Sequence, residues 1–270
     1  MINIKKYRLL VGLCSWNNPN LLKKCISSLI YSMDLNKDGI AVVLNESDIE
    51  SINYLHNLKI PFVSVPENSG PLGIDFLLPF VQHSEFFMNS NDDMLFHPGF
   101  ADDLISIIQK SYPCTASCRL IENFNSNNAV VTVDASLPNI DDDFVYDKFI
   151  MNYNCGKYKH DYYTIGWMHP ICILSKDFLE IGGYSGNWDL DFLSGYGRDD
   201  MFPFLLKKFK NYNFICSKNS FVYHGSSASM KRLPDSIRQQ HNIDKFHQKA
   251  GISLMEFRHL MELNKQIREL

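Results

Sequence analysis

Three groups of polar residues in this sequence combine side chains that could do chemistry together. The first is Asn91-Asp92-Asp93, which directly follows a strand-like segment at 85–88. Adjacent carboxylates repel each other, so they favour a divalent cation such as Mg²⁺ or Mn²⁺ that bridges them to a diphosphate. Such a cation neutralises the charge of a departing diphosphate. The alternative is a solvated acidic turn that caps a helix, and this cluster alone does not separate the two.

The second group is the segment Tyr196-Gly197-Arg198-Asp199-Asp200, which leads into an apolar helical pattern from Met201. Gly182-Gly183-Tyr184 and Trp188 precede it. A carboxylate at a helix start, beside aromatic rings that can stack on sugars, suits a general base acting on a hydroxyl group. The same residues also suit a plain helix cap with an acid in its first turn, and that alternative stays open.

The third group is His224, which ends the apolar run 221–223 and precedes a Gly-Ser-Ser turn. A single histidine at a strand end is more often a structural hydrogen-bonding group than a metal ligand. Its interest therefore depends on the two acidic groups that come before it in the chain.

Repeated strand-then-helix patterns would place these groups at one edge of a sheet. Each expected strand ends in polar residues, and the alternation predicts a mostly parallel sheet whose ligands gather outside the carboxyl ends of its strands. The expected strands of this half are 8–14, 39–44, 61–65 and 85–88, and the expected helices are 19–30, 48–58 and 72–82.

The pattern is less regular in the second half of the sequence. A helix at 100–110 and a strand at 114–121 precede residues 122–164, which are rich in Asn, Asp and Tyr and predict a long functional loop or a small subdomain. Further elements are expected at 167–174, from Ser175, at 199–210 and in a strand that ends at His224. From 235 onward the chain is expected to be helical, with an apolar stripe of Leu254, Phe257, Leu260, Met261 and Ile267.

Composition narrows the classes of protein. With 270 residues, 45% of them hydrophobic, 21% charged and a net charge of −4, the chain reads as one globular unit. The sequence lacks the basic stripe that is typical of nucleic-acid-binding proteins. It also has no apolar run that approaches the ~20 residues of a membrane span. The 7 cysteines lack the regular spacing of a disulfide scaffold, so we expect reduced thiols and a cytoplasmic protein, with any membrane contact peripheral.

In this order, the three groups resemble the inverting, family 2-like glycosyltransferases of the GT-A fold. The resemblance covers about residues 7–230, and 195–200 is similar to that family's G-W-G-x-E-D form. It implies an α/β, GT-A-type, Rossmann-like three-layer sandwich with a mostly parallel central sheet and C-terminal helices. The implied catalytic domain is 1–232, with a nucleotide-sugar half of about 1–110, an acceptor half of about 111–232, and a helical extension at 233–270.

The resemblance also assigns a role to each group. It implies that Asp93 and His224 bind the metal ion, Mn²⁺ or Mg²⁺, that Asp200 is the catalytic base and that Asp199 holds the acceptor. Trp188 and Tyr196 would line the acceptor side. Residues near the nucleotide-sugar would be Cys14, Ser15, Trp16, Asn45, Asn68, Asn91 and Asp92. Two positions depart from the family: Asn91 replaces the first acid of D-x-D, and Asn45-Glu46 stands where the family often has an Asp facing uracil.

The resulting hypothesis is a metal-assisted transferase of the hexosyltransferase type. It would move a sugar with inversion from a nucleotide diphosphate sugar, UDP-sugar favoured, to a hydroxyl group of a glycan, lipid-linked or protein acceptor. One alternative is a sugar nucleotidyltransferase, which needs a glycine-rich phosphate loop where this chain has Ser15–Pro19 without glycine. Another is a carbohydrate-binding domain that has lost turnover, which Asn91 motivates. For the C-terminal helices we expect packing on the domain, with homodimer formation as the alternative.

Overall fold

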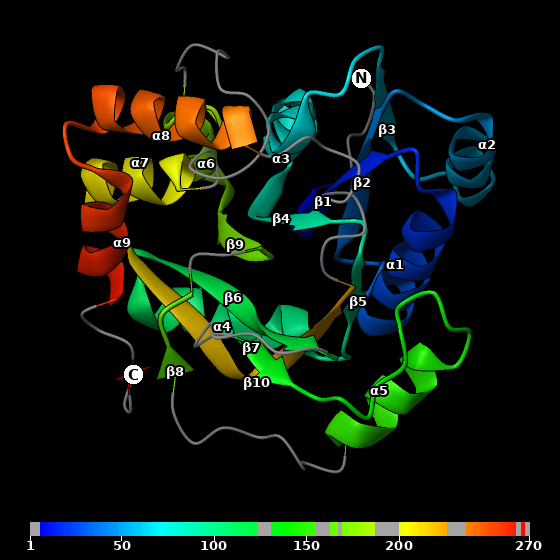
Figure 1. Ribbon diagram of the computed structural model, residues 1–270. Helices are drawn as coiled ribbons and strands as arrows, with labels where there is room; N and C mark the ends of the chain where they lie inside the picture. Colours follow the sequence, from blue (N-terminus) through cyan, green and yellow to red (C-terminus); the bar gives the residue numbers. More distant parts are fainter. Residues whose placement is uncertain are drawn as a thin grey trace.

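The structure is a computed structural model of the chain, and it describes residues 6–123, 131–154, 163–166, 169–186, 200–225, 236–262 and 266–267. A curled sheet crosses the molecule, and helices cover both of its faces (Figure 1). The expected α/β class and the layered architecture are therefore confirmed.

The first half of the chain alternates strands and helices as the sequence predicts. The strands β1, β2, β3 and β4 run parallel to one another, in the pairs β4-β1, β1-β2 and β2-β3. Their bounds, with those of the connecting helices, are β1 Tyr7–Trp16, α1 Pro19–Ser32, β2 Gly39–Asn45, α2 Ile49–Leu58, β3 Phe62–Val65 and β4 Ser84–Asn91.

One expected helix, at 72–82, is split in two. A 3₁₀ helix, η1, spans Gly70–Leu77, and a short α-helix, α3, spans Leu78–Val81. Gly70 begins the segment with a positive φ of 57°. Pro79 has no backbone N–H and cannot continue the hydrogen bonding of a helix, so the helix restarts around it.

The second half of the sheet is mixed in direction. The strand order is β11-β8-β10-β6-β9-β4-β1-β2-β3, with β5 paired to β10 and β7 paired to β6. β9 lies between β4 and β6 and is antiparallel to both, whereas β6 and β10 are parallel to each other. The strands of this half are β5 Met94–Phe96, β6 Cys114–Glu122, β7 Val131–Val133, β8 Tyr163–Thr164, β9 Ile171–Leu174, β10 Asn213–His224 and β11 Gln266–Ile267.

The remaining helices include one within the segment expected to be a long loop. α5, Val145–Asn154, buries Val145, Phe149 and Tyr153 in a small apolar cluster with the ends of β6 and β10. Residues 122–164 therefore carry regular structure of their own. The other helices are α4 Phe100–Ser111, α6 Ser175–Glu180, α7 Met201–Lys210, α8 Ser236–Ala250 and α9 Leu254–Glu262.

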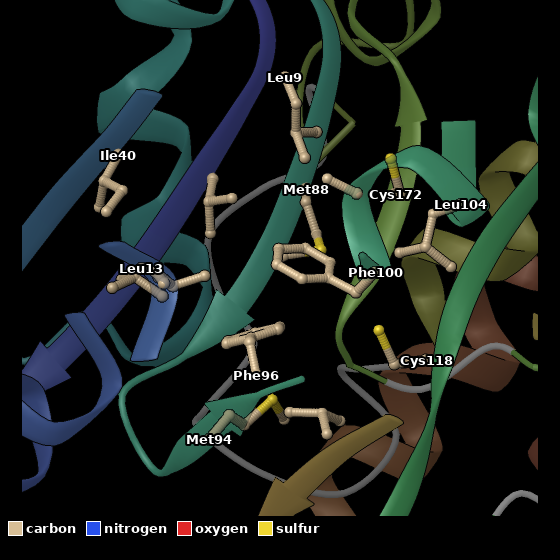
Figure 2. Packing of buried hydrophobic residues seen from close by; sticks show 14 of the residues in the cluster. Leu9, Leu13, Ile40, Met88, Met94, Phe96, Phe100, Leu104, Cys118 and Cys172 are labelled. Atoms are coloured by element: carbon tan, nitrogen blue, oxygen red, sulfur yellow. The ribbon is translucent and has the colours of Figure 1, made fainter. Parts of the chain in front are cut away.

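The alternation of side chains along β1 separates two hydrophobic cores. Leu9 and Leu13 point to the face covered by α1, α2 and α4, and Leu10 points to the opposite face. Figure 2 shows the first core, in which Phe100 and Leu104 of α4 pack near Met88 and Cys172. Because both faces of β1 are buried, its sequence is a continuous apolar run.

The C-terminal helices belong to the second core. Phe246 of α8 and Phe257 of α9 pack against each other, with ring centroids 5.7 Å apart, and both contact Phe204 of α7. Figure 1 shows α8 and α9 beside α7. The tail therefore packs on the same body as the sheet, as expected from its mixed charges and apolar stripe.

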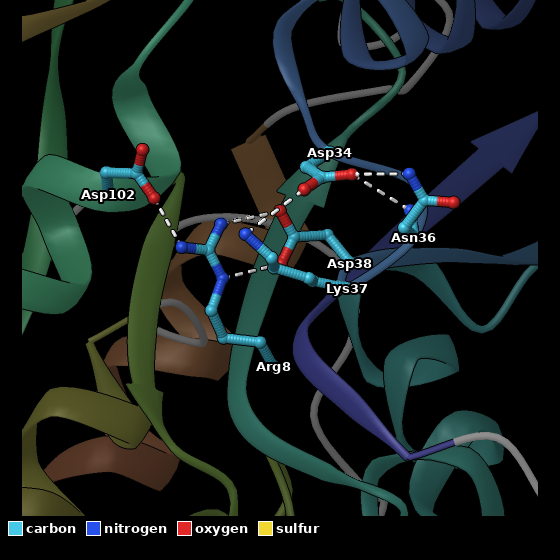
Figure 3. Close-up of polar contacts among 6 residues, drawn as sticks. All are labelled: Arg8, Asp34, Asn36, Lys37, Asp38 and Asp102. Atoms are coloured by element: carbon cyan, nitrogen blue, oxygen red, sulfur yellow. Dashed lines mark hydrogen bonds and ion pairs between the residues drawn. The ribbon is translucent and has the colours of Figure 1, made fainter.

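A buried ion pair closes the amino end of the sheet. The Arg8 guanidinium donates to both carboxylate oxygens of Asp38, at 2.9 and 2.7 Å, and also pairs with Asp102 of α4 (Figure 3). Asp38 is 1% exposed, and in the turn before it Asp34 accepts hydrogen bonds from the backbone and side-chain amides of Asn36. These contacts join β1, the β2 entry and α4.

Two further observations bear on the sequence expectations. In the described ranges, every helix is too short or too polar to cross a bilayer. The described cysteines form no disulfide bonds. Cys114 and Cys118 are buried in the sheet, and among the described residues they belong to no group of metal-binding side chains.

Candidate active site

The polar residues expected near a nucleotide lie together at the carboxyl ends of the parallel strands. In the sheet register, Cys14 of β1 is opposite Asn91 of β4, and Trp16 is opposite Asn45 of β2. Asn45 is buried, whereas Cys14, Trp16 and Asn91 are half-buried. The edge therefore offers partly open side chains on β1 and β4, beside the buried Asn45 of β2.

Hydrogen bonds fix the loops around this edge. The Trp16 indole N–H donates to Glu46 at 2.7 Å. The Asn45 side-chain oxygen accepts from the Ser69 hydroxyl at 2.8 Å, and the Asn68 side chain accepts from the Gly70 backbone N–H at 2.9 Å. The predicted residues Asn45 and Asn68 thus hold the turn after β3 in place in this structure.

The acidic cluster lies at the same edge and is buried. Asp92 is 6% exposed and Asp93 is 5% exposed. The Ser15 hydroxyl donates to Asp92 Oδ2 at 2.6 Å, which joins two of the predicted residues directly. The acidic turn is therefore not a solvated surface loop.

A short strand that the sequence did not reveal brings His224 to Asp93. β5 begins at Met94, directly after Asp93, and pairs antiparallel with the end of β10. Met94 therefore lies opposite His224. The Gly225 backbone N–H donates to the Asp93 carbonyl at 2.8 Å. As a result, His224 Nε2 lies 3.7 Å from Asp93 Oδ2.

Glu122 lies on the other side of the same histidine. Its Oε1 is 2.7 Å from His224 Nδ1, and Glu122 is 6% exposed. Burial lowers the pKa of His224, but the hydrogen bond to Glu122 and the charges of Asp93 and Glu122 outweigh it, so the pKa is raised above its ordinary value. The histidine ring thus bridges two buried carboxylates.

The negative charge of this corner also affects the pKa of a neighbouring thiol. Burial raises the pKa of the Cys25 thiol, and the charges of Asp92 and Asp93 raise it further. Asp93 Oδ1 is buried and has no hydrogen-bond donor within the described chain. Buried polar atoms are rarely left without a partner, so this oxygen points to a missing positive group.

Asp93 and His224 fit as two of the ligands of a divalent cation. The 3.7 Å between Asp93 Oδ2 and His224 Nε2 is too long for a hydrogen bond but short enough for both atoms to contact one small cation. In the described segments, however, no group of three or more His, Cys, Asp or Glu forms a complete metal site. Mg²⁺-type ions commonly take only one or two protein carboxylates and complete their shell with substrate phosphates and water.

The expected catalytic base, Asp200, lies at the start of α7 and is held by the C-terminal extension. Arg258 of α9 donates to both of its carboxylate oxygens, at 2.8 and 2.7 Å, and Asp200 is 2% exposed. The sequence gave no indication of this ion pair. It connects the predicted acceptor side to α9.

The turn after α6 is hydrogen-bonded to η1. Asp75 of η1 accepts from the backbone N–H groups of Tyr184 and Ser185, at 2.6 and 2.9 Å. Gly183 has φ +81°, and a Cβ there would collide with the Asp75 carboxylate. Glycine is therefore needed at this position.

The other predicted acceptor residues, Asp199, Trp188 and Tyr196, lie outside the residues that the structure describes. Sequence reasoning also missed Glu122, Asp75 and Arg258 as site neighbours. Glu122 stands at a strand end, which is the one signal that could have marked it. Arg258 lies in a polar helical tail with no distinguishing pattern.

Neither a protein-family model nor a curated protein matches the sequence. Solved structures do match the fold. GalNAc-T7, in a structure with UDP, GalNAc and Mn²⁺, matches with a TM-score of 0.59 and 12% identity over 96% of this chain and 57% of that one. S. aureus TarS 1–349 in complex with UDP-GlcNAc matches with a TM-score of 0.60 and 10% identity, over 93% of this chain and 69% of that one.

These similarities establish the fold as that of the GT-A glycosyltransferases. The chain spans little more than half the length of the GalNAc-T7 chain. At 10–12% identity they establish nothing more specific about this chain.

Proposed function

We propose that this chain is a metal-assisted, inverting glycosyltransferase that uses a nucleotide diphosphate sugar, with a UDP-sugar favoured. The observation that carries the proposal is the buried corner of Asp93, Glu122 and His224 at the carboxyl ends of the sheet. It combines negative charge, an unsatisfied carboxylate oxygen and a histidine nitrogen in a fold whose solved examples include complexes with UDP or UDP-GlcNAc.

In this proposal Asp93 and His224 hold a divalent cation together with the donor diphosphate. When bound, the cation supplies charge neutralisation for the leaving nucleoside diphosphate. Asp92, oriented by Ser15, and the half-buried Asn91 face the nucleotide-sugar. Trp16 and Asn45 border the base, in loops that Glu46 and Ser69 hold in place.

Asp200 is proposed as the base that accepts the proton of the acceptor hydroxyl during attack on the anomeric carbon. Arg258 donates one hydrogen bond to each oxygen of this carboxylate, which leaves each oxygen a second lone pair that can accept the proton. Acceptor binding near Asp199, Trp188 and Tyr196 is proposed to bring the hydroxyl group to one of these lone pairs. The acceptor itself, a glycan, lipid-linked or protein hydroxyl group, is left open.

The same ion pair favours a second candidate, a carbohydrate-binding domain without turnover. Such a domain would keep the donor corner but leave Asp200 permanently paired with Arg258. The variant Asp200→Asn separates the two. For the transferase we expect transfer to fall by about 10²–10⁴-fold with UDP binding unchanged, because a general base contributes about that much. A variant that turns over like the wild type would refute the base assignment.

The primary test is a thermal-shift panel of UDP, GDP, ADP and their sugars, each with and without Mn²⁺. We expect a stabilising shift for one nucleotide that depends on Mn²⁺, followed by detection of released nucleoside diphosphate with that donor. No shift with any nucleotide would overturn the proposal. Release of nucleoside monophosphate would indicate a nucleotidyltransferase instead.

A further inference from the structure

Glu122 lies in the buried corner that carries the proposed function, but that proposal assigns it no role of its own. It is the last residue of β6, next to the last residue of β10, because Tyr223 pairs with Ile121 in the parallel register. This pairing places Glu122 beside His224, with Oε1 2.7 Å from Nδ1. The contact thus follows from the sheet itself and not from a surface loop.

The contact determines which ring nitrogen of His224 carries the proton. An ionised carboxylate only accepts hydrogen bonds, so Nδ1 must be the donor. In the neutral ring Nε2 then presents its lone pair, and Nε2 is the nitrogen that faces Asp93 at 3.7 Å. The opposite tautomer would direct a proton toward Asp93 and block a metal ion there.

Among the residues that the structure describes, Glu122 has no competing cationic partner that would reduce this effect. Within the described part of the chain, neither Lys nor Arg pairs with Glu122, and its side chain is 7% exposed. A buried carboxylate hydrogen-bonded to the far nitrogen of a ligating histidine fixes the ring and increases its basicity toward a metal ion.

We propose that Glu122 is a positioning residue that holds His224 so that Nε2 and Asp93 together bind a divalent cation. This inference rests on the proposed function, because it concerns the metal ion of the same site. It adds a residue that the sequence patterns did not mark. It also predicts that metal affinity depends on a side chain that never contacts the metal ion.

The test measures Mn²⁺ binding to the whole chain by electron paramagnetic resonance, with and without UDP. We expect Glu122→Leu to weaken Mn²⁺ binding about 10–100-fold. Glu122→Gln should lose less, because its amide oxygen can still accept from Nδ1. Glu85→Gln is the matched control: it makes the same chemical change at an exposed residue at the other end of the sheet, and it should bind Mn²⁺ like the wild type.

A second measurement is independent of the metal ion. Nitrogen-15 NMR of the metal-free protein, at a pH above the raised pKa of His224 where the ring is neutral, reports the tautomer. We expect Nδ1–H for His224 in the wild type and a mixture in Glu122→Leu. Unfolding in urea shows whether each variant is folded. If both Glu122 variants bind Mn²⁺ as the wild type does, the inference is wrong and the proposed function stands. If the wild type itself binds no Mn²⁺, with or without UDP, the metal step of the proposed function fails and the inference fails with it.

Discussion

Buried carboxylates lie at both ends of the sheet, but their surroundings differ. At the amino end, Asp38 receives two hydrogen bonds from Arg8. At the carboxyl end, Asp93 and Glu122 share one histidine, and neither pairs with Lys or Arg among the residues described. An uncompensated buried charge costs several kcal/mol, and at the carboxyl end one histidine faces two carboxylates, so an added cation would stabilise that arrangement. We therefore propose that the ion pair at the amino end contributes to stability and that the corner at the carboxyl end binds a ligand.

Replacing Asp93 should produce the largest effect. In Asp93→Asn we expect Mn²⁺ affinity and sugar transfer to fall about 10³-fold, because a ligating charge that stabilises the leaving group contributes several kcal/mol. The free energy of unfolding of the metal-free protein should change much less, because relief of the repulsion from nearby carboxylates opposes the loss of attraction to His224. Calorimetric Mn²⁺ titration and urea unfolding measure the two quantities. A stable variant with wild-type Mn²⁺ affinity would remove the basis of the comparison.

Breaking the Arg8–Asp38 ion pair at the amino end should lower stability and leave Mn²⁺ affinity unchanged. Arg8→Met leaves Asp38 buried without its main partner, and we expect a loss of about 3 kcal/mol in the free energy of unfolding. The affinity of the folded variant for Mn²⁺ should match the wild type, because the change lies at the opposite end of the sheet. Urea unfolding followed by circular dichroism measures the stability. A variant as stable as the wild type would show that this ion pair contributes little.

The sequence predicted the parallel half of the fold because its signals are local. The strands that became β1, β2 and β4 are apolar runs that end in polar turns, and each helix between them shows its own periodicity. β5 was missed, because three residues carry no periodic signal and the strand exists through pairing with β10, far along the chain. The direction of β9 was also hidden, since antiparallel insertion depends on contacts with β4 and β6.

The site was predictable to a similar extent. Residues at the ends of strands could be grouped, and the structure brings Ser15 to Asp92 and His224 to Asp93. Their roles remain predictions. Glu122 and Arg258 were missed because a single acid or arginine gives no pattern until its partner is known. Asn45 was expected at the nucleotide, whereas its contact in this structure is with Ser69.

Asp200 provides a third buried carboxylate and a finer test of the comparison. Like Asp38, it forms an ion pair with an arginine, although it lies on the proposed acceptor side. A double-mutant cycle with Asp200→Asn and Arg258→Gln should give a coupling of about 2 kcal/mol in the free energy of unfolding. Mn²⁺ affinity should not change in either variant. A coupling near zero would mean that Arg258 does not hold α9 against α7 through this carboxylate.

The smallest expected effect is the pH dependence of the carboxyl-end corner in the metal-free protein. The pKa of His224 is raised in the folded state, so its charged form stabilises the fold. This contribution is fully present below the unfolded pKa of about 6.5 and is lost as pH rises through the higher folded value. The stability difference between the wild type and His224→Gln should therefore shrink as the pH rises from 6 to 9. Urea unfolding at several pH values, with Arg8→Met as the control that should show no such trend, would measure it. A difference that grows with pH would mean that burial outweighs the two carboxylates, and the corner would then be less negative than its contacts indicate.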